Sequence, residues 1–230
     1  AWVQQVNECV LSLDEGVGQL IQALKETGQL ANTLVVFTAD QGFSMGEHGF
    51  RTKIAPYDAN YASPLIVSQP GTIPEGKHCP QCVTAPDLIA TFHARTGVAQ
   101  PWKMHGRDIS PLLSDPEKAA WPHLCFYEHM GHHYGSDVTK ELKAGGKEAN
   151  HSNVPWYVVV RDGRYKYIRY LQAGNMDELY DLKSDPEELT NLAGSAEHAK
   201  RVADLGNKLT AELRRTGADF IDLIPEPKAN

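Results

Sequence analysis

The sequence has little of what marks several common classes of protein. Basic residues are not in excess: 22 Lys and Arg stand against 29 Asp and Glu, which gives a formal net charge of −7. A surface that follows nucleic-acid phosphates needs a basic excess, so this composition does not favour a nucleic-acid-binding protein. No apolar run approaches the roughly 18 residues that a membrane-spanning helix needs, and the first residues carry no secretory signal pattern. The acidic composition does not exclude a small anionic substrate, because a few cations gathered at one site are enough to bind it.

Cysteine is scarce, and its spacing does not support the usual cysteine chemistry. Among four cysteines, Cys79 and Cys82 form a C-x-x-C pair. A zinc site would need a second ligand pair at matching spacing, and a thioredoxin-like site would place the pair where a strand opens into a helix. Neither condition is met, because the pair follows a turn-rich segment at residues 69–76. We interpret the pair as either a loop disulfide or two unreactive thiols.

The bulk composition is that of an ordinary globular protein. The chain has 230 residues, of which 41% are apolar and 22% charged, enough for one large domain or for a domain with a subdomain. The opening residues, Ala1 to Gln5, read as the interior of a helix. We therefore expect further sequence upstream of Ala1.

The first part of the chain alternates predicted helices and strands. Apolar residues at steps of three and four predict an amphipathic helix from Val3 to Leu24, ended by Gly28. Residues 33–38 and 65–67 are short apolar runs, which predict buried strands of a parallel sheet. A further helix is predicted over 86–95. This pattern is typical of an α/β sheet covered by helices, so residues 1–113 form the first predicted domain.

The composition changes after Leu113. Residues 114–153 are polar and rich in His and Gly without a clear period, and we interpret them as a long variable loop. Residues 154–230 then predict a small α+β subdomain, with an antiparallel sheet and a C-terminal helix.

Local signals support that subdomain. Asp162-Gly163 predicts the turn of a hairpin between strands at 156–161 and 164–171, in which one face is packed and the other solvated. A third strand is predicted over 178–182, and Asp185-Pro186-Glu187-Glu188 has the form of a helix start. An apolar stripe over 202–213 predicts the final helix.

The chemistry-bearing residues gather in the polar loop that runs from Ala39 to about Tyr61. Ligands of such sheets bind beyond the carboxyl ends of strands, where this loop begins. Asp40 and Gln41 offer a carboxylate and an amide carbonyl, oxygen donors that suit a hard cation such as Ca²⁺. His48 can donate a proton or a hydrogen bond, and Lys53 supplies a positive charge for an anionic oxygen. Taken singly, each residue could equally be a solvated turn or surface side chain.

Four blocks of the sequence together resemble the sulfatases of the alkaline phosphatase superfamily. Residues 33–42 are similar to the strand end that binds their metal, and Gly46-Glu47-His48-Gly49 followed by Lys53 is similar to their next signature. Residues 11–21 resemble the preceding helix. The stretches 166–168, 178–182, 185–187 and 191–193 resemble the family's C-terminal tail. The resemblance covers most of the chain except residues 114–153.

The resemblance implies a fold, a metal and roles for particular residues. The fold would be the C-terminal part of an alkaline-phosphatase-like sandwich, with a mostly parallel sheet and helices on both faces. Asp40 and Gln41 would be two ligands of a divalent cation, most simply Ca²⁺, and Lys53 would contact the sulfate. His48 would line the sulfate pocket. Relatives that cleave phosphate or phosphonate esters often have His after this Asp, so Gln41 favours calcium and sulfate esters.

The resemblance also shows what the chain lacks. The family's nucleophile is a formylglycine made from the first residue of a C/S-x-P-x-R motif, and none of the cysteines begins one. The nearest match, Ser114-Asp115-Pro116-Glu117-Lys118, ends in Lys and lies downstream of the metal loop, so we reject it. The paired N-terminal aspartates are also absent. We therefore expect a sulfuric ester hydrolase fragment, inactive without the N-terminal half of the same protein, in the periplasm or outside the cell. A phosphodiesterase or phosphonate monoester hydrolase, and a non-catalytic metal- or anion-binding remnant, are the alternatives.

Six of the ten histidines fall between His105 and His151. In one interpretation His132 and His133 contact the substrate, since loops held by a scaffold often carry specificity. In another the segment is a polar surface loop. A zinc site formed by His129, His132 and His133 is a third interpretation, which no Cys or carboxylate pair at suitable spacing supports.

Overall fold

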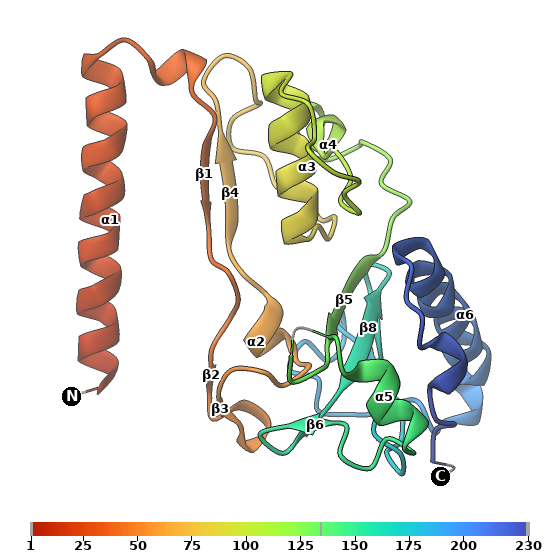
Figure 1. Cartoon of the computed structure of the whole chain (residues 1–230). Coiled ribbons are helices and arrows are strands. Elements are labelled where there is room, and N and C mark those ends of the chain that lie inside the picture. Colours follow the sequence, from red (N-terminus) through yellow and green to blue (C-terminus); the bar gives the residue numbers. More distant parts are fainter. Residues whose placement is uncertain (1, 134, 229–230) are drawn as a thin grey trace. The chain divides into compact units, whose positions relative to one another are not determined.

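The computed structural model describes residues 2–133 and 135–228 (Figure 1). It divides into two compact units. The first comprises the residues up to Ala39 together with 64–79 and 111–119, and the second comprises 40–63, 80–110 and the chain from Ala120 onward. Among the described residues no helix is long and apolar enough to cross a membrane.

The first unit begins with the long helix α1, Trp2–Glu26. It ends as predicted before Gly28, whose φ of 70° lies in the left-handed region that glycine adopts at helix ends. The apolar stripe of α1 is largely exposed, with Val3 at 66% and Leu20 at 68% of full exposure. A stripe of this kind is normally buried against another element, whereas no element in the described part of the chain buries the apolar face of α1.

Strands β1, Val35–Thr38, and β4, Leu65–Ser68, form the sheet of the first unit (Figure 1). They pair antiparallel, with Val36 opposite Val67. The prediction that these were buried parallel strands was therefore wrong in two respects: the pair is antiparallel, and Ile66 of β4 is 62% exposed. A strand made entirely of apolar residues is expected to be buried on both faces. Its sequence does not specify the direction of its neighbour, nor which segment of the protein packs on each face. The short 3-10 helix η1, Leu30–Asn32, precedes β1.

The second unit is built on an antiparallel four-stranded sheet in the order β10-β9-β8-β5. Its strands are β5, Cys125–His129; β8, Tyr157–Arg161; β9, Tyr165–Tyr170; and β10, Glu178–Asp181. The predicted hairpin is confirmed as β8 and β9, in which Val159 pairs with Ile168. The predicted third strand is confirmed as β10.

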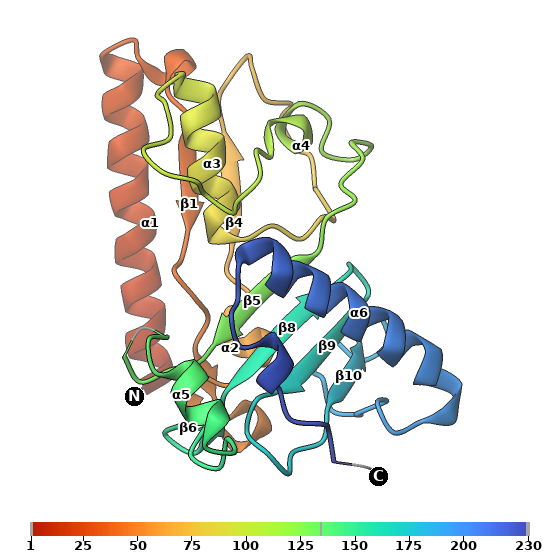
Figure 2. The same ribbon diagram turned by 45° about the vertical axis from the view of Figure 1, so that its right-hand side comes forward.

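One face of this sheet is covered by helix α6, Ala199–Thr216 (Figure 2). Leu205, Leu209 and Leu213 of α6 are at most 2% exposed and pack against alternate residues of the sheet. Burying each such leucine contributes roughly 1.5–3 kcal/mol. The predicted final helix and its apolar stripe are thus confirmed.

The other face of the sheet is covered by residues 50–61, which belong to the same unit. Tyr157, Val159 and Ile168 are fully buried on this face, where Tyr57 and Tyr61 pack against them. The prediction of one packed and one solvated face was therefore wrong for β9, because a segment more than 90 residues earlier in the chain covers the second face.

Part of the segment predicted as a loop is regular. Besides β5, it contains helix α5, Val138–Lys143, and the first strand of the small pair β6, Asn150–His151, and β7, Val154–Pro155. The loop prediction was wrong for these residues. β5 has only five residues, in which apolar and polar side chains do not alternate, and α5 has fewer than two turns, so neither shows a clear period.

The predicted helix start at residues 185–188 is also wrong, since α6 begins at Ala199 after the 3-10 helix η3, Ala196–His198. The Asp185 carboxylate does accept two backbone N–H groups, those of Leu189 and Thr190. Glu188, however, has a φ of 56°, which ends any helix at that position.

The remaining helices of the chain are short apart from α3, Ala85–Thr96, which is confirmed at the predicted place. Thr84 and Asp87 form its capping box, and Gly97 ends it with a φ of 70°. The others are α2, Asp58–Tyr61; α4, Ser110–Ser114; and the 3-10 helices η2, Glu47–Gly49, and η4, Ile221–Leu223.

A buried ion cluster joins residues 58 and 188 to the sheet. The ammonium of Lys166, on β9, is fully buried and lies 2.8 Å from an Asp58 carboxylate oxygen and 2.6 Å from a Glu188 carboxylate oxygen. The other Glu188 oxygen accepts the backbone N–H of Asp58 at 2.6 Å. Arg161, on β8, adds a second cation at 3.1 Å from Asp58. The start of α2 is therefore fixed to the sheet by charge as well as by apolar packing.

We predict that Lys166→Met destabilises the protein by about 3–5 kcal/mol, because it leaves the buried Glu188 carboxylate without its cation. The measurement is urea denaturation at pH 7. As a control, Lys208→Met removes the exposed pair with Asp162 and is expected to change the free energy of unfolding by no more than about 1 kcal/mol. Equal losses in the two variants would contradict the role given to the buried cluster.

Candidate functional site

The site loop, defined as residues 40–61, begins directly after β1 with Asp40 and Gln41. The backbone N–H of Gly42 donates to the Asn60 carbonyl at 2.7 Å. A Cβ atom on residue 42 would lie 2.2 Å from the Ala59 carbonyl oxygen, so only glycine fits this approach. The residue after Gln41 is thereby tied to helix α2, and the start of the loop cannot move independently of its end.

Within the site loop a small hairpin carries the chain from Ser44 to Thr52. Strands β2, Ser44–Met45, and β3, Arg51–Thr52, pair antiparallel with Ser44 opposite Thr52. The side chain of Asn60, which is 2% exposed, bridges these two facing residues. Its Oδ1 accepts the Ser44 hydroxyl at 3.1 Å, and its Nδ2 donates to the Thr52 carbonyl at 2.8 Å. Asn60 therefore contacts both strands of the hairpin.

Lys53 follows the hairpin in an unusual backbone. Thr52 has a φ of 76° and Ile54 a φ of 93°. Positive φ is strongly disfavoured for β-branched residues and costs about 1–3 kcal/mol at each position, so it persists only where surrounding contacts impose it. Here the Thr52 carbonyl accepts from Asn60, and the Ile54 carbonyl accepts from the Tyr157 hydroxyl. The Lys53 side chain between them is exposed.

The side chains of Asp40, Gln41 and Lys53 make no hydrogen bond or ion pair with any described residue. Asp40 and Gln41 offer oxygen donors alone, a set that fits a hard cation such as Ca²⁺. Calcium takes roughly six to eight oxygens, and within residues 2–133 and 135–228 no group of three His, Cys, Asp or Glu side chains could hold a metal ion. The residues present therefore fit two ligands of a calcium site and do not complete it.

His48 lies in the same loop but is held by packing. Its ring stacks on Tyr57, with centroids 3.7 Å apart, and its Nε2 lies 2.9 Å from the Glu187 carbonyl oxygen. Because a carbonyl only accepts, Nε2 carries the hydrogen of this bond. No interaction joins His48 to Lys53 among the described residues. The structure thus shows an anchoring contact for His48, while its place in the sulfate pocket stays a prediction.

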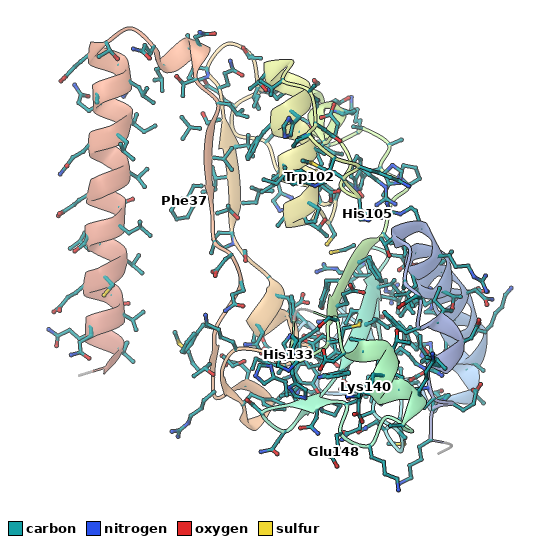
Figure 3. The ribbon with its side chains drawn as sticks, in the orientation of Figure 1. Phe37, Trp102, His105, His133, Lys140 and Glu148 are labelled. Carbon is teal, nitrogen blue, oxygen red and sulfur yellow. The ribbon has the colours of Figure 1, made fainter. Side chains whose placement is uncertain are left out.

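His132 and His133 lie on the exposed loop after β5, where Figure 3 labels His133. Their backbone N–H groups donate to the Asp137 carboxylate at 3.0 and 3.3 Å, and the bond from His132 is the main cause of a lowered Asp137 pKa. Among the described residues no hydrogen bond or ring contact joins either histidine to Asp40, Gln41 or Lys53. Their predicted contact with the substrate stays a prediction.

His129, which the sequence analysis did not propose as a substrate contact, is more buried than His132 and His133. His129, the last residue of β5, lies between His151 and Tyr157, with ring centroids 5.5 and 5.6 Å away. Its Nε2 is buried and finds no hydrogen-bond partner in the described part of the chain. Burial, and then the charge of His151, lower the pKa of His129. The sequence of β5 shows no alternation of apolar and polar residues, so only the structure reveals the burial of His129.

All four cysteines are free thiols, so of the two interpretations of Cys79 and Cys82 that of unpaired thiols holds. Cys82 instead contacts Cys125 of β5, and this hydrogen bond lowers the pKa of Cys82. The indole N–H of Trp121 donates to the Cys82 carbonyl at 3.2 Å and fixes the backbone there.

Comparison with known proteins gives a consistent result. Residues 46–215 match a family described as N-sulphoglucosamine sulphohydrolase, C-terminal, a range that includes Lys53 but not Asp40 and Gln41. The chain is 33% identical over 221 residues to N-acetylglucosamine-6-O-sulfatase of Bacteroides thetaiotaomicron, which covers 95% of the chain and 36% of that protein.

Two solved structures are similar in fold. One, described as a complex with its substrate D-glucosamine-2-N,6-O-disulfate, aligns with a TM-score of 0.74 and 28% identity over 93% of the chain and 40% of that structure. The other, a phosphonate monoester hydrolase of Agrobacterium radiobacter, aligns with a TM-score of 0.72 and 29% identity over 90% of the chain and 40% of that structure. The chain thus spans about two fifths of the length of the proteins that it matches.

We predict that acidification from pH 7 to pH 5 destabilises the protein, and less so in His129→Phe. The pKa of His129 is lower in the folded protein than the value of 6.5 for the free side chain. The stability that comes from its neutral form is therefore fully present above pH 6.5 and is lost as the pH falls through the folded pKa. Denaturant titrations at both pH values measure this loss. His78→Phe, at an exposed position, is the control and should follow the wild type; a His129→Phe profile equal to both would refute the assignment.

Proposed function

The chain belongs to the sulfatase family, of which it carries the C-terminal portion, and on that basis we propose that it supplies one half of the active site of a sulfuric ester hydrolase. The fold agrees with this family, since the similar structures are sulfatases and a related hydrolase aligned over nearly the whole chain. The half-site would consist of Asp40, Gln41 and Lys53, with His48 beside them.

One observation carries the proposal. The site loop is fixed in position by Gly42, Asn60 and buried contacts with the sheet, while Asp40, Gln41 and Lys53 have no partner among the described residues. A rigid backbone that presents unpaired polar side chains is what a ligand site requires, because the geometry is set before binding.

Each residue has a distinct proposed role. Asp40 and Gln41 would provide two oxygen ligands to Ca²⁺, which when bound supplies positive charge that stabilises the transferring sulfuryl group. Lys53 would donate to an oxygen of the sulfate, as a point charge on a flexible stem. His48 would face the substrate through Nδ1, since its Nε2 already donates to the Glu187 carbonyl.

The other half of the site would come from an N-terminal part of the same protein. The sequence contains no C/S-x-P-x-R motif for a formylglycine nucleophile, so this chain alone would be inactive. The exposed apolar stripe of α1 and the 62% exposed Ile66 of β4 support such a partner, because both are surfaces that a further part of the protein would cover.

The proposed substrate is a sulfated sugar, or another small sulfate ester, in the periplasm or outside the cell. The names of the matched family and of the Bacteroides relative, both of them hydrolases of sulfated glucosamine, support the sugar. His132 and His133 would contribute specificity, since they lie on an exposed loop of the same unit as Lys53.

A phosphonate monoester hydrolase or phosphodiesterase is the second candidate, supported by the similarity to the Agrobacterium enzyme. Gln41 weighs against it, because an amide oxygen suits Ca²⁺ better than the transition metals that imidazole ligands prefer. A non-catalytic binding remnant is the third, and it predicts a coding region that begins near Ala1.

The first experiment is to sequence the coding region immediately upstream of Ala1. A C/S-x-P-x-R motif with a nearby pair of aspartates supports the proposed function. An initiator codon with neither feature refutes catalysis and favours the remnant.

We predict that the complete polypeptide hydrolyses an aryl sulfate and that Lys53→Ala lowers kcat/KM by about 10²–10³-fold, as expected for the loss of a group that stabilises transition-state charge. Chelation with EDTA should abolish activity, and added Ca²⁺ should restore it. Lys77→Ala, which removes only the exposed pair with Glu117, is the matched control. A preference for a phosphonate ester with reactivation by Mn²⁺ or Zn²⁺ would favour the second candidate.

A further inference from the structure

We propose that Asn60 and Tyr157 are positioning residues that together clamp the peptide groups on either side of Lys53, an inference that rests on the proposed function of Lys53. Neither residue touches the reacting groups in this scheme. They act through the backbone from which the Lys53 side chain projects.

The first argument is the conformation of the clamped residues. Thr52 and Ile54 are β-branched, yet both have positive φ. Such residues relax to negative φ unless neighbouring contacts prevent it. The carbonyl oxygen of each of these two residues receives a side-chain hydrogen bond, one from Asn60 and one from Tyr157. The donors therefore sit where the unusual backbone needs support, one residue before Lys53 and one residue after it.

The second argument is that Tyr157 is itself rigid. It is fully buried in β8, and burial raises the pKa of its hydroxyl, which keeps the group protonated and able to donate. Its single hydrogen points to Ile54, so the 2.6 Å contact with Tyr61 must be a bond that Tyr61 donates. Tyr61 stacks on Tyr127 with ring centroids 4.2 Å apart. The clamp after Lys53 is thus part of the packed sheet rather than a mobile surface side chain.

The third argument is that the oxygen and the nitrogen of the Asn60 side-chain amide each make a hydrogen bond. Oδ1 accepts from Ser44 while Nδ2 donates to Thr52, and the backbone carbonyl of Asn60 accepts from Gly42. One residue therefore contacts the loop both next to Gln41 and next to Lys53. Aspartate at this position could keep the bonds from Ser44 and Gly42, but it would place a carboxylate oxygen against the Thr52 carbonyl. Asn60→Asp is thus a selective break of the contact next to Lys53.

The test uses two nearly isosteric variants of the complete polypeptide, Asn60→Asp and Tyr157→Phe, with two matched controls. Asn191→Asp alters another asparagine that bridges backbone groups, at Leu179 and Asp177. Tyr167→Phe removes another buried hydroxyl of the same sheet, which donates to Asp177. The measurements are kcat and KM for an aryl sulfate, calcium affinity by titration calorimetry, and amide hydrogen exchange over residues 50–56.

We expect Asn60→Asp and Tyr157→Phe each to lower kcat by about tenfold to a hundredfold, because small displacements of a positioned group are costly. KM and calcium affinity should change by no more than about twofold, and exchange over residues 50–56 should become faster. Neither control should change kcat or this exchange, although both lower the melting temperature. Unchanged kcat, or a loss no larger than in the controls, overturns the proposal.

If the wild-type polypeptide hydrolyses no sulfate ester, the proposed function fails, and the clamp is then judged by exchange alone. Faster exchange over residues 50–56 in both variants, and in neither control, supports it. Equal exchange in all five proteins overturns it.

Discussion

The buried ammonium of Lys166 is the interaction on which the rest of the second unit depends. It lies on the central hairpin of the sheet and is held by two carboxylates from segments 130 residues apart, Asp58 and Glu188. A charge in this place is tolerated because both carboxylates pair with the ammonium, while the backbone N–H of Asp58 satisfies the second oxygen of Glu188. The same contacts fix the first residue of α2, and Asn60 is two residues further on. The electrostatics of the sheet interior therefore determine where the site loop lies.

The sequence was sufficient for those parts of the fold that local signals specify. Helix α1 ends before Gly28, α3 ends before Gly97, and the turn at Gly163 joins β8 to β9, because period, capping and turn chemistry act over a few residues. Features that depend on distant segments were missed. The direction of β1 and β4 carries no local signature. The helix start predicted at residues 185–188 failed because Glu188 is committed to Lys166, 22 residues earlier in the chain.

The candidate site divides in the same way. Asp40, Gln41 and Lys53 could be found from the sequence because they belong to short, recognisable blocks. Asn60 and Tyr157 could not, since neither lies in such a block with Lys53, and Tyr157 meets Ile54 across 103 residues of chain. For His48, the sequence identified the residue but not its contacts. Its block is recognisable, but only the structure shows that its ring stacks on Tyr57 and that its Nε2 is already bonded. Sequence blocks thus identify chemistry-bearing residues better than they identify the residues that orient them.

The long sequence separation of these contacts has a consequence for the order of folding. Asp58 meets Lys166 across 108 residues and Glu188 across 130, and both contacts close large loops whose entropy must be lost before they form. During synthesis the site loop leaves the ribosome well before the strands that it packs on. Its strained backbone at Ile54 lacks the hydrogen bond from Tyr157 until β8 arrives. The segment that carries the proposed chemistry therefore becomes ordered late, after the hairpin that follows it by about a hundred residues has formed.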